Sequence, residues 1–367
     1  MAAVAVANPQ QPPGQFVQPS AGYKEIYNGP KVYDEEAETK GTDKQPAATY
    51  PHYLPVWDKD VVYPALTPFV HYEHGIDAKP SFKNLLANNA EVVDLTATIG
   101  AEVSGVQLHQ LTNLGKDELA LFVAQKKVVA FRNQDFANLP IDDALGYARY
   151  FGRLHIHPSS GAPKDFPETR TNSIAWHSDV TYEKQPPGTT FLYLLDGPSS
   201  GGDTLFLNQA AAYNRLSPAF QKRLHGLQAV HSAHEQAQQS KDRGGVVRRE
   251  PITSTHPLVR THPTIGEKAL FVNPQFTRHI VGFKKEESDY LLKFLYDHMA
   301  LSQDIQTRVR WAPGTVVVWD HEKTLDYTPP LVSLIGLHFI VAVVSLFVVK
   351  ISFILHRARA FVCRYEL

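Results

Sequence analysis

Short apolar runs separated by polar, proline or glycine residues dominate the chain from about residue 90 onward. The runs TTFLYLLDGP (189–198), GGDTLFLN (201–208) and GTVVVWD (314–320) are rich in β-branched and aromatic residues, which favour strands. The segment 91–108 indicates further short strands interrupted by glycines. The run at 314–320 is apolar enough to be a buried strand.

Apolar residues at helical spacing occupy the intervals between these runs. The segment 112–134 begins as a helix and ends in the strand VVAFRN (128–133), and PIDDALGYARYFG (140–152) is an amphipathic helix. Two further helical segments are predicted within 210–227 and 284–300. Many short strands with inserted helices favour a mainly β fold, a distorted barrel or jelly roll, over a βαβ array.

The first 50 residues have a different composition. Proline, glutamine, alanine and charged residues dominate stretches such as QQPPGQFVQPSAG and DEEAETKGTDKQP. Such a segment cannot bury enough apolar surface to offset the entropy of ordering, so residues 1–50 are predicted to be largely disordered. For residues 16–33, an extended arm packed on the folded domain is the alternative.

Charge and cysteine content narrow the class of protein. The 367 residues carry a formal net charge of −1 and a single cysteine, Cys363. Because the balance is near neutral and no basic face is evident, no nucleic-acid partner is expected. One cysteine excludes an intramolecular disulfide, and the N-terminal MAAVAVA lacks the preceding basic residue of a signal peptide. A cytoplasmic location is therefore expected for the folded domain.

The stretch WHSDVTYEKQPPG contains a candidate metal-binding pair, His177 and Asp179. In a strand-like segment the side chains at i and i+2 share a face, so these two converge while Ser178 turns away. One imidazole nitrogen and one carboxylate oxygen suit Fe(II). With a distant second histidine they would form the facial triad of non-haem iron oxygenases, which leaves three positions for co-substrate and O2. An isolated H-x-D pair is common by chance and needs further context.

That context is a resemblance to the taurine/α-ketoglutarate dioxygenase (TauD/TfdA) family over about residues 90–320. The resemblance implies a double-stranded β-helix (jelly roll). It also implies an enzyme that uses Fe(II), 2-oxoglutarate and O2 to hydroxylate a substrate, with release of succinate and CO2. The stretches that carry it, in the family's order, are FGRLHIHP (151–158), WHSDVT (176–181), GGDTLF (201–206), HPLVRTHPTIGEKALFVNPQFT (256–277) and WAPGTVVVWD (311–320).

Carried over residue by residue, His177 and Asp179 match the family's first two iron ligands. Thr204 matches a threonine that hydrogen-bonds 2-oxoglutarate, and a packing role in a strand is the alternative. His157 matches a histidine that contacts the sulfonate in taurine-using members, and a structural role is equally open. The tyrosine that follows it in the family is Ser160 here, which disfavours taurine itself.

Three neighbouring residues have less defined roles. Trp176 is expected to pack beside the metal without touching it. Asn273 and Phe276 are candidates for the substrate side of the site or for the protein core.

The family's third iron ligand is absent from its place. It is a histidine that follows a W-D-N-R stretch, and counting from Trp319 and Asp320 puts Asp326 at that position. His321 and Glu322 replace the asparagine and the arginine. Three interpretations stay open: Asp326 acts as the ligand, His321 or a later histidine reaches in, or the chain is not a working enzyme.

The later histidine is His338, and a second departure lies beside it. Where the family has arginines, one of which clamps 2-oxoglutarate, this chain has Leu337 and Val341. Neither can form the bidentate ion pair of an arginine. Divergence of the C-terminal end, or translation across an exon boundary near residues 320–332, would explain both departures.

The residues that follow form a long apolar run. LVSLIGLHFIVAVVSLFVV (331–349) contains no Asp, Glu, Lys or Arg. As a helix it would be about 28 Å long, close to the hydrocarbon thickness of a bilayer. Residues 331–355 are therefore predicted as a membrane-anchoring helix, followed by a basic tail at 356–367. The alternative is a pair of buried strands. It is disfavoured because residues 337–355 contain no Gly, Pro, Asn or Asp to form the turn between two strands.

Together these patterns predict a dioxygenase-like domain at 90–326. The functional hypothesis is an Fe(II)- and 2-oxoglutarate-dependent dioxygenase that oxidises a small anionic substrate such as a sulfonate. The alternative is a catalytically impaired, membrane-associated protein of the same fold.

Overall fold

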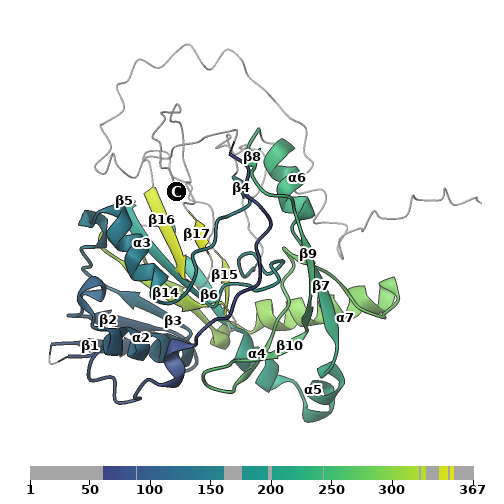
Figure 1. Ribbon diagram of the computed structural model, residues 1–367. Helices are drawn as coiled ribbons and strands as arrows, with labels where there is room; N and C mark the ends of the chain where they lie inside the picture. The colour runs from purple at the N-terminus through teal and green to yellow at the C-terminus, as the bar shows by residue number, and fades with distance from the viewer. Residues whose placement is uncertain are drawn as a thin grey trace, which may run out of the picture.

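The structure is a computed structural model, and the fold it shows is mainly β with inserted helices (Figure 1). This part of the sequence-based prediction is confirmed. The described residues are 61–87, 89–160, 176–196, 201–242, 244–321, 324–327, 339–345 and 348–350.

A seven-stranded sheet forms the main layer, in the order β1-β2-β3-β14-β5-β16-β17. Its neighbouring strands are antiparallel except for the parallel pair β2 and β3. The strands are β1 (Glu91–Asp94), β2 (Ala101–Ser104), β3 (Val128–Phe131), β5 (Thr189–Asp196), β14 (Val316–Asp320), β16 (Phe339–Ser345) and β17 (Val348–Lys350).

The central strand β14 is buried along its whole length, as its sequence predicts. Val316 and Val318 point to one face, where they pack in a core cluster with α2 (Asn113–Lys126) and α3 (Ile141–Arg149). Val317 and Trp319 point to the other face and join a second cluster. A strand covered on both faces needs apolar residues at every position, which explains the unbroken run VVVW.

A three-stranded sheet covers the second face of β14. Its order is β13-β6-β15, with β6 at Thr204–Asn208, β13 at Gln306–Val309 and β15 at Thr324–Tyr327. Phe206 packs against Trp319 with ring centroids 5.4 Å apart, and Val309 belongs to the same cluster. Two sheets joined by an apolar layer are the arrangement of a jelly roll.

A third region of sheet and helix lies beside this sandwich, where Figure 1 shows α4, α5 and α7 near β7. Leu224, Ala229 and Leu292 belong to the core cluster that joins α5, β7 and α7. The predicted helical segment 210–227 is divided, because Ser217 caps a new helix with Pro218 at its first position. The remaining elements are α4 (Gln209–Arg215), α5 (Pro218–Leu224), α6 (His234–Asp242), α7 (Lys285–Leu301), β4 (Ser159–Ser160), β7 (Gln228–Ser232), β8 (Val246–Val247), β9 (Thr253–Pro257), β10 (Val259–Thr261), β11 (Lys268–Leu270), β12 (Thr277–Ile280) and the short 3-10 helices His74–Ile76, Leu108–Gln110, Phe136–Asn138 and Gln303–Ile305.

The residues that precede β1 also pack on the domain. The backbone N–H of Phe69 donates to the side chain of Gln185 at 2.9 Å, and Gln185 donates back to the carbonyl of Phe69 at 2.8 Å. His74 lies 2.8 Å from Asp117 of α2. The predicted disordered region, 1–50, and the alternative arm at 16–33 lie outside the described residues.

The prediction of a single long helix over 331–355 is wrong where the structure describes this region. Residues 339–345 form β16, which pairs with β5, and residues 348–350 form β17. Valine and isoleucine dominate these runs, and β-branched residues suit a strand beside an open edge of β5. Residues 331–338, 346–347 and 351–355 of the predicted helix, and the basic tail at 356–367, lie outside the described residues. In the described part of the chain, none of the helices combines the length and apolarity needed to cross a bilayer.

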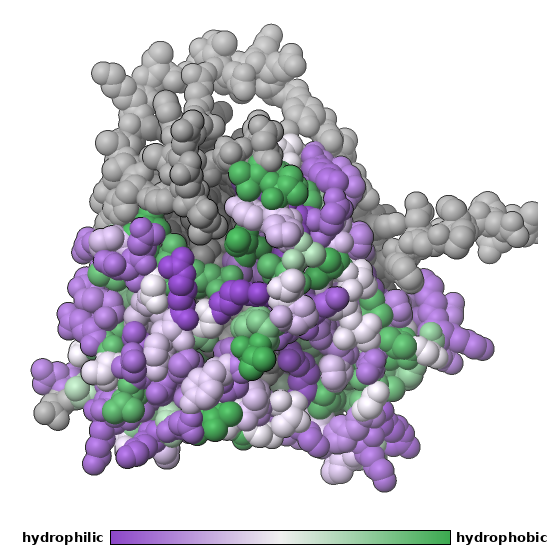
Figure 2. Space-filling model, viewed as in Figure 1, coloured by the Kyte–Doolittle hydropathy of each residue, from purple (hydrophilic) through white to green (hydrophobic). Residues whose placement is uncertain are grey.

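Apolar and hydrophilic residues are interspersed over the face drawn in Figure 2. Exposed large apolar side chains lie along the N-terminal segment, among them Val70 and Tyr72, and on α7, among them Tyr290 and Phe294. Exposure of some apolar residues is normal for a folded domain.

Candidate active site

His177 and Asp179 face each other, with 3.6 Å between Nε2 of the histidine and Oδ1 of the aspartate. Their side chains are 11% and 9% exposed, so a ligand held by both would be largely shielded from solvent. Two donors that each lie about 2.1 Å from one transition-metal ion are at most about 4.2 Å apart. The pair therefore fits two ligands of a single ion, and its imidazole and carboxylate donors suit Fe(II).

The segment 176–183, called the ligand turn below, reverses direction immediately after Asp179. Val180 has φ of 48°, in the left-handed region, and is fully buried. This conformation is an outlier for a β-branched residue and costs on the order of 1–3 kcal/mol. The surrounding structure must hold it. The Val180 side chain packs with Tyr182 and Phe276 in a small core cluster.

Polar side chains from three other segments hold the far end of the ligand turn. Asn273 Nδ2 donates to Thr181 Oγ1 at 3.1 Å, and His231 Nδ1 lies 2.9 Å from the same oxygen. His256 Nε2 donates to the carbonyl of Glu183 at 2.9 Å. Asn273 is therefore a support of the turn. Phe276 is fully buried in the core beside Tyr182, with ring centroids 5.0 Å apart.

A buried ionic cluster closes the ligand turn at Glu183. One carboxylate oxygen, Oε1, accepts from Arg249 Nη2 and lies 2.7 Å from His155 Nε2. The other, Oε2, accepts from Arg249 Nη1 at 3.4 Å. Arg249 also donates to the carbonyl of Ile156 at 3.4 Å. The side chains of His155, Glu183 and Arg249 are no more than 3% exposed, so the charges of Glu183 and Arg249 interact in a medium of low dielectric.

Burial governs the protonation of this region. It holds the pKa of His155 and His231 well below the ordinary value, and it lowers the pKa of His256 to about 4. Nearby positive charges act in the same direction, Arg249 on His155 and Arg260 on His256. Burial also raises the pKa of Glu183, and Arg249 opposes that effect. The three histidines are neutral in the folded protein at neutral pH.

The neutral state of His256 predicts an acid-sensitive fold. Its pKa is about 4 when folded and 6.5 as the ordinary value, so the unfolded chain binds the proton first as the pH falls. The free energy of unfolding should therefore decrease from about pH 6.5 downward, by about 3 kcal/mol at pH 4 for this residue alone. Urea unfolding of the wild type and His256→Gln at several pH values measures this. Parallel pH dependence in the two proteins would contradict the prediction.

His321 contacts the ligand turn through Ser178. It follows β14 and is 1% exposed. Its Nδ1 is 2.9 Å from Ser178 Oγ, and Ser178 donates to its carbonyl at 3.1 Å. Its Nε2 is hydrogen-bonded to Thr190 Oγ1. Both ring nitrogens thus face hydroxyl groups, one of them on the residue between His177 and Asp179. This arrangement disfavours His321 as the third ligand.

The other candidates for the third ligand are less defined. The backbone of Asp326 lies in β15 opposite Phe206 of β6, and His338 lies outside the described residues. Among the described side chains, three or more His, Cys, Asp or Glu do not gather into a group that could hold a metal ion. Within this part of the chain, His177 and Asp179 are therefore a pair of candidate ligands without a third beside them.

Thr204 and His157 lie in separate segments, Thr204 in β6 and His157 in the irregular segment before β4. Thr204 begins β6, is 2% exposed, and accepts a hydrogen bond from Trp311 Nε1 at 3.0 Å. His157 bonds the carbonyl of Ser159 through Nδ1, and its ring is 6.5 Å from that of His155. His155 contacts Glu183, so His157 is connected to the ligand turn through the ionic cluster. Trp176, at the start of the turn, packs against the core cluster of α5, β7 and α7.

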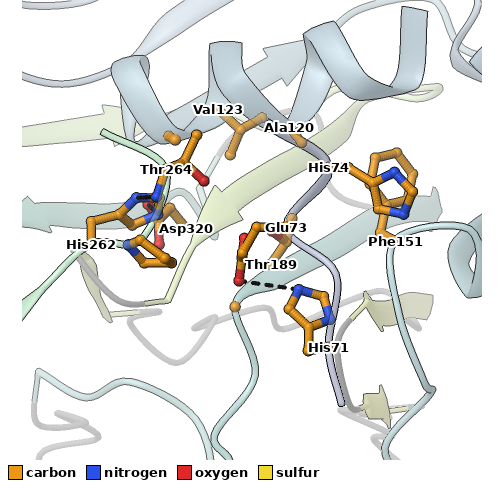
Figure 3. A pocket seen from close by; sticks show the side chains of 13 residues that line it. His71, Glu73, His74, Ala120, Val123, Phe151, Thr189, His262, Thr264 and Asp320 are labelled. Carbon is orange, nitrogen blue, oxygen red and sulfur yellow. Dashed lines mark hydrogen bonds and ion pairs between the residues drawn. The ribbon is translucent and has the colours of Figure 1, made fainter. Parts of the chain in front are cut away.

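A separate pocket of about 480 Å³, including its opening, lies between the N-terminal segment and the ends of β5 and β14 (Figure 3). His71 and Glu73 line one side, 3.1 Å apart, and His262 and Asp320 line the other, 3.0 Å apart. Each of these imidazoles already has a carboxylate partner. The lining includes neither His177 nor Asp179.

Sequence reasoning missed the groups that support the site. Val180, Glu183 and Arg249 were not among the predicted functional residues, although WHSDVTYE and VVRRE contain all three. The sequence offered little indication of Glu183 and Arg249, because charged residues are usually exposed and only the fold shows that this pair is buried together.

Comparisons with known proteins identify the family and the fold. The family model described as "Taurine catabolism dioxygenase TauD, TfdA family" matches residues 91–325. An α-ketoglutarate-dependent sulfonate dioxygenase of Saccharomyces cerevisiae is 42% identical over 309 residues, 77% of this chain and 75% of that protein. The α-ketoglutarate-dependent dioxygenase cnsP of Penicillium expansum is 41% identical over 315 residues, 79% of this chain and 85% of that protein. The crystal structure of a taurine dioxygenase from Burkholderia xenovorans is similar, with a TM-score of 0.54 and 28% identity over 68% of this chain and 88% of that one.

Proposed function

Because this chain belongs to the TauD/TfdA family of α-ketoglutarate-dependent dioxygenases, enzymes that use Fe(II) and 2-oxoglutarate, we propose that it oxidises a small sulfonate-like anion at a site built on His177 and Asp179. The observation that carries the proposal is the 3.6 Å separation of these two side chains in a nearly buried turn. Two ligands of the right chemistry at that separation suit one ion and leave other coordination positions open.

Fe(II) held by His177 and Asp179 would supply the O2 chemistry of the reaction, which consumes 2-oxoglutarate and oxidises the substrate. The protein contributes binding, orientation and exclusion of water. We assign Thr204 to 2-oxoglutarate, since its hydroxyl lies at the start of β6 and is held in place by Trp311. A buried hydroxyl can orient a carboxylate by donating a hydrogen bond to it.

His157 is assigned to the anionic group of the substrate. Two observations support this assignment: its motif corresponds to the sulfonate-contacting histidine of taurine-using members, and a 42% identical relative bears the name of a sulfonate dioxygenase. Its backbone neighbours are held by Arg249, which donates to the carbonyl of Ile156. A fixed loop lets His157 offer a hydrogen bond without losing further conformational freedom on binding.

Substrate-dependent formation of succinate tests the proposal. Purified protein with Fe(II), ascorbate, O2 and 2-oxoglutarate should release more succinate with an alkyl sulfonate than with a carboxylate or amine of equal length. His157→Ala should raise the KM for the sulfonate about 10-fold or more, because loss of a hydrogen bond to a charged group costs about 1.5–3 kcal/mol. Equal turnover with all three substrates would exclude the sulfonate assignment, and full activity in Asp179→Ala would exclude the site.

A further inference from the structure

One residue of the ligand turn has a backbone conformation that its residue type disfavours. Val180, next to Asp179, has φ of 48° and a branched side chain that is fully buried. Any relaxation of this residue toward an ordinary backbone conformation would move Asp179 relative to His177. The turn therefore needs a restraint on its C-terminal side to keep the two side chains 3.6 Å apart.

Glu183 is placed to supply that restraint. Its backbone N–H donates to the carbonyl of Val180 at 2.9 Å, which closes a turn over Thr181 and Tyr182 immediately after the strained residue. Its side chain binds Arg249 through both carboxylate oxygens and contacts His155 at 2.7 Å. Its carbonyl accepts a hydrogen bond from His256 at 2.9 Å. All three polar parts of Glu183 are thus engaged: the N–H within the turn, and the side chain and carbonyl by residues remote in the sequence.

A gain in the free energy of unfolding does not explain why Glu183 and Arg249 form a buried ion pair. Desolvation of a buried ion pair offsets most of its attraction, and apolar residues of equal volume are often as stabilising. A forked guanidinium on a carboxylate instead fixes one geometry with high directional specificity. The same arginine also holds the carbonyl of Ile156, beside His157. The cluster thus connects the ligand turn with the segment that carries the proposed substrate contact.

We propose that Glu183 is a positioning residue: clamped by Arg249 and His155, it holds the strained turn at Val180 and so sets the separation of His177 and Asp179 for the metal. This inference rests on the proposed function, because it takes those two residues as the metal ligands. In this role Glu183 acts through the turn and would not itself be a metal ligand.

Metal affinity in the absence of catalysis tests the proposal. The full-length wild type and Glu183→Gln would be titrated with Mn(II) alone, with free Mn(II) followed by electron paramagnetic resonance. We expect the affinity of Glu183→Gln to fall about 10- to 100-fold, the usual effect of removing a group that orients a metal ligand. The Mn(II) spectrum of the bound form should broaden, since a loosened turn holds the ion in more than one geometry.

The matched control is Glu118→Gln. Glu118 lies in α2 and is 2% exposed, as Glu183 is, and its carboxylate accepts hydrogen bonds from the backbone of Asn84 and Leu85 at 2.7 and 2.8 Å. The substitution removes one buried charge in both proteins, but Glu118 does not contact the ligand turn. We expect Glu118→Gln to bind Mn(II) with wild-type affinity even where its thermal stability falls.

A second variant covers the case in which Glu183→Gln does not fold, since it leaves Arg249 buried without a carboxylate. The double substitution Glu183→Gln with Arg249→Gln removes both charges and should fold while still binding Mn(II) more weakly. Wild-type affinity in a folded Glu183→Gln or double variant overturns the positioning role and leaves the metal site intact. A wild type that binds no Mn(II), or a His177→Ala that binds it equally well, overturns the proposed site and the positioning role with it.

Discussion

Replacing His177 by alanine should remove more than about 99% of the affinity for Fe(II) and abolish succinate formation. The substitution deletes one of the two donors that lie 3.6 Å apart in the ligand turn. Loss of a group that only orients a ligand already lowers metal affinity about 10- to 100-fold, so loss of a ligand exceeds that range. Iron content after anaerobic reconstitution and succinate release would measure the two effects.

His225→Ala is a suitable control for this substitution. His225 is exposed and bonds the hydroxyl of Tyr213 at 2.6 Å, away from the ligand turn. Its iron content and turnover should equal those of the wild type. Retention of stoichiometric iron in His177→Ala would mean that other residues hold the metal.

The second large effect concerns 2-oxoglutarate. We expect this chain to bind it about 30- to several-thousand-fold more weakly than a family member that keeps the clamping arginine. Leu337 and Val341 occupy the corresponding region of the sequence, so we expect one carboxylate of 2-oxoglutarate to have no arginine partner there. Truncating one partner of such a pair costs about 2–5 kcal/mol. Calorimetric titration of the Mn(II)-loaded protein with 2-oxoglutarate measures the dissociation constant directly.

Substitutions at Asp326 and Val341 test separately the missing histidine ligand and the missing arginine. Asp326→His restores an imidazole at the ligand position and should raise metal affinity without restoring 2-oxoglutarate binding. Adding Val341→Arg to it should lower the dissociation constant for 2-oxoglutarate. A dissociation constant for 2-oxoglutarate that is already as low in the wild type as in a family member with the arginine, and that Val341→Arg leaves unchanged, would contradict the prediction and would mean that another residue binds this carboxylate.

Local patterns in the sequence predicted the sandwich well. The run VVVW in β14 could be recognised as a buried strand because a strand covered on both faces has no polar positions. His177 and Asp179 could be identified as a pair because their spacing and motif are local. The supporting cluster could not, since Glu183 and Arg249 are 66 residues apart and become neighbours only through the fold.

The error at 331–355 has a physical cause. A run of valine, isoleucine and phenylalanine without charges is compatible with a buried strand or an apolar helix, and periodicity does not separate them. The length of the run favoured a helix, and the lack of turn residues argued against two strands. The structure shows instead that β5 has room for a neighbour on the side away from β14, which β16 occupies. The need for a strand beside β5 arises from the pairing of the whole sheet, and no pattern within residues 331–355 indicates it.

The position of β16 also has a consequence for shortened forms of this protein. β5 is paired on both sides, with β14 and with β16, and its sequence TTFLYLLD is strongly apolar. A chain ending before residue 339 would leave the backbone N–H and C=O groups along one side of this strand open to another molecule. Exposed apolar edges of this kind recruit further strands and promote aggregation. By pairing with this edge of β5, β16 protects the sandwich from aggregation, independently of any part that the strand plays in chemistry.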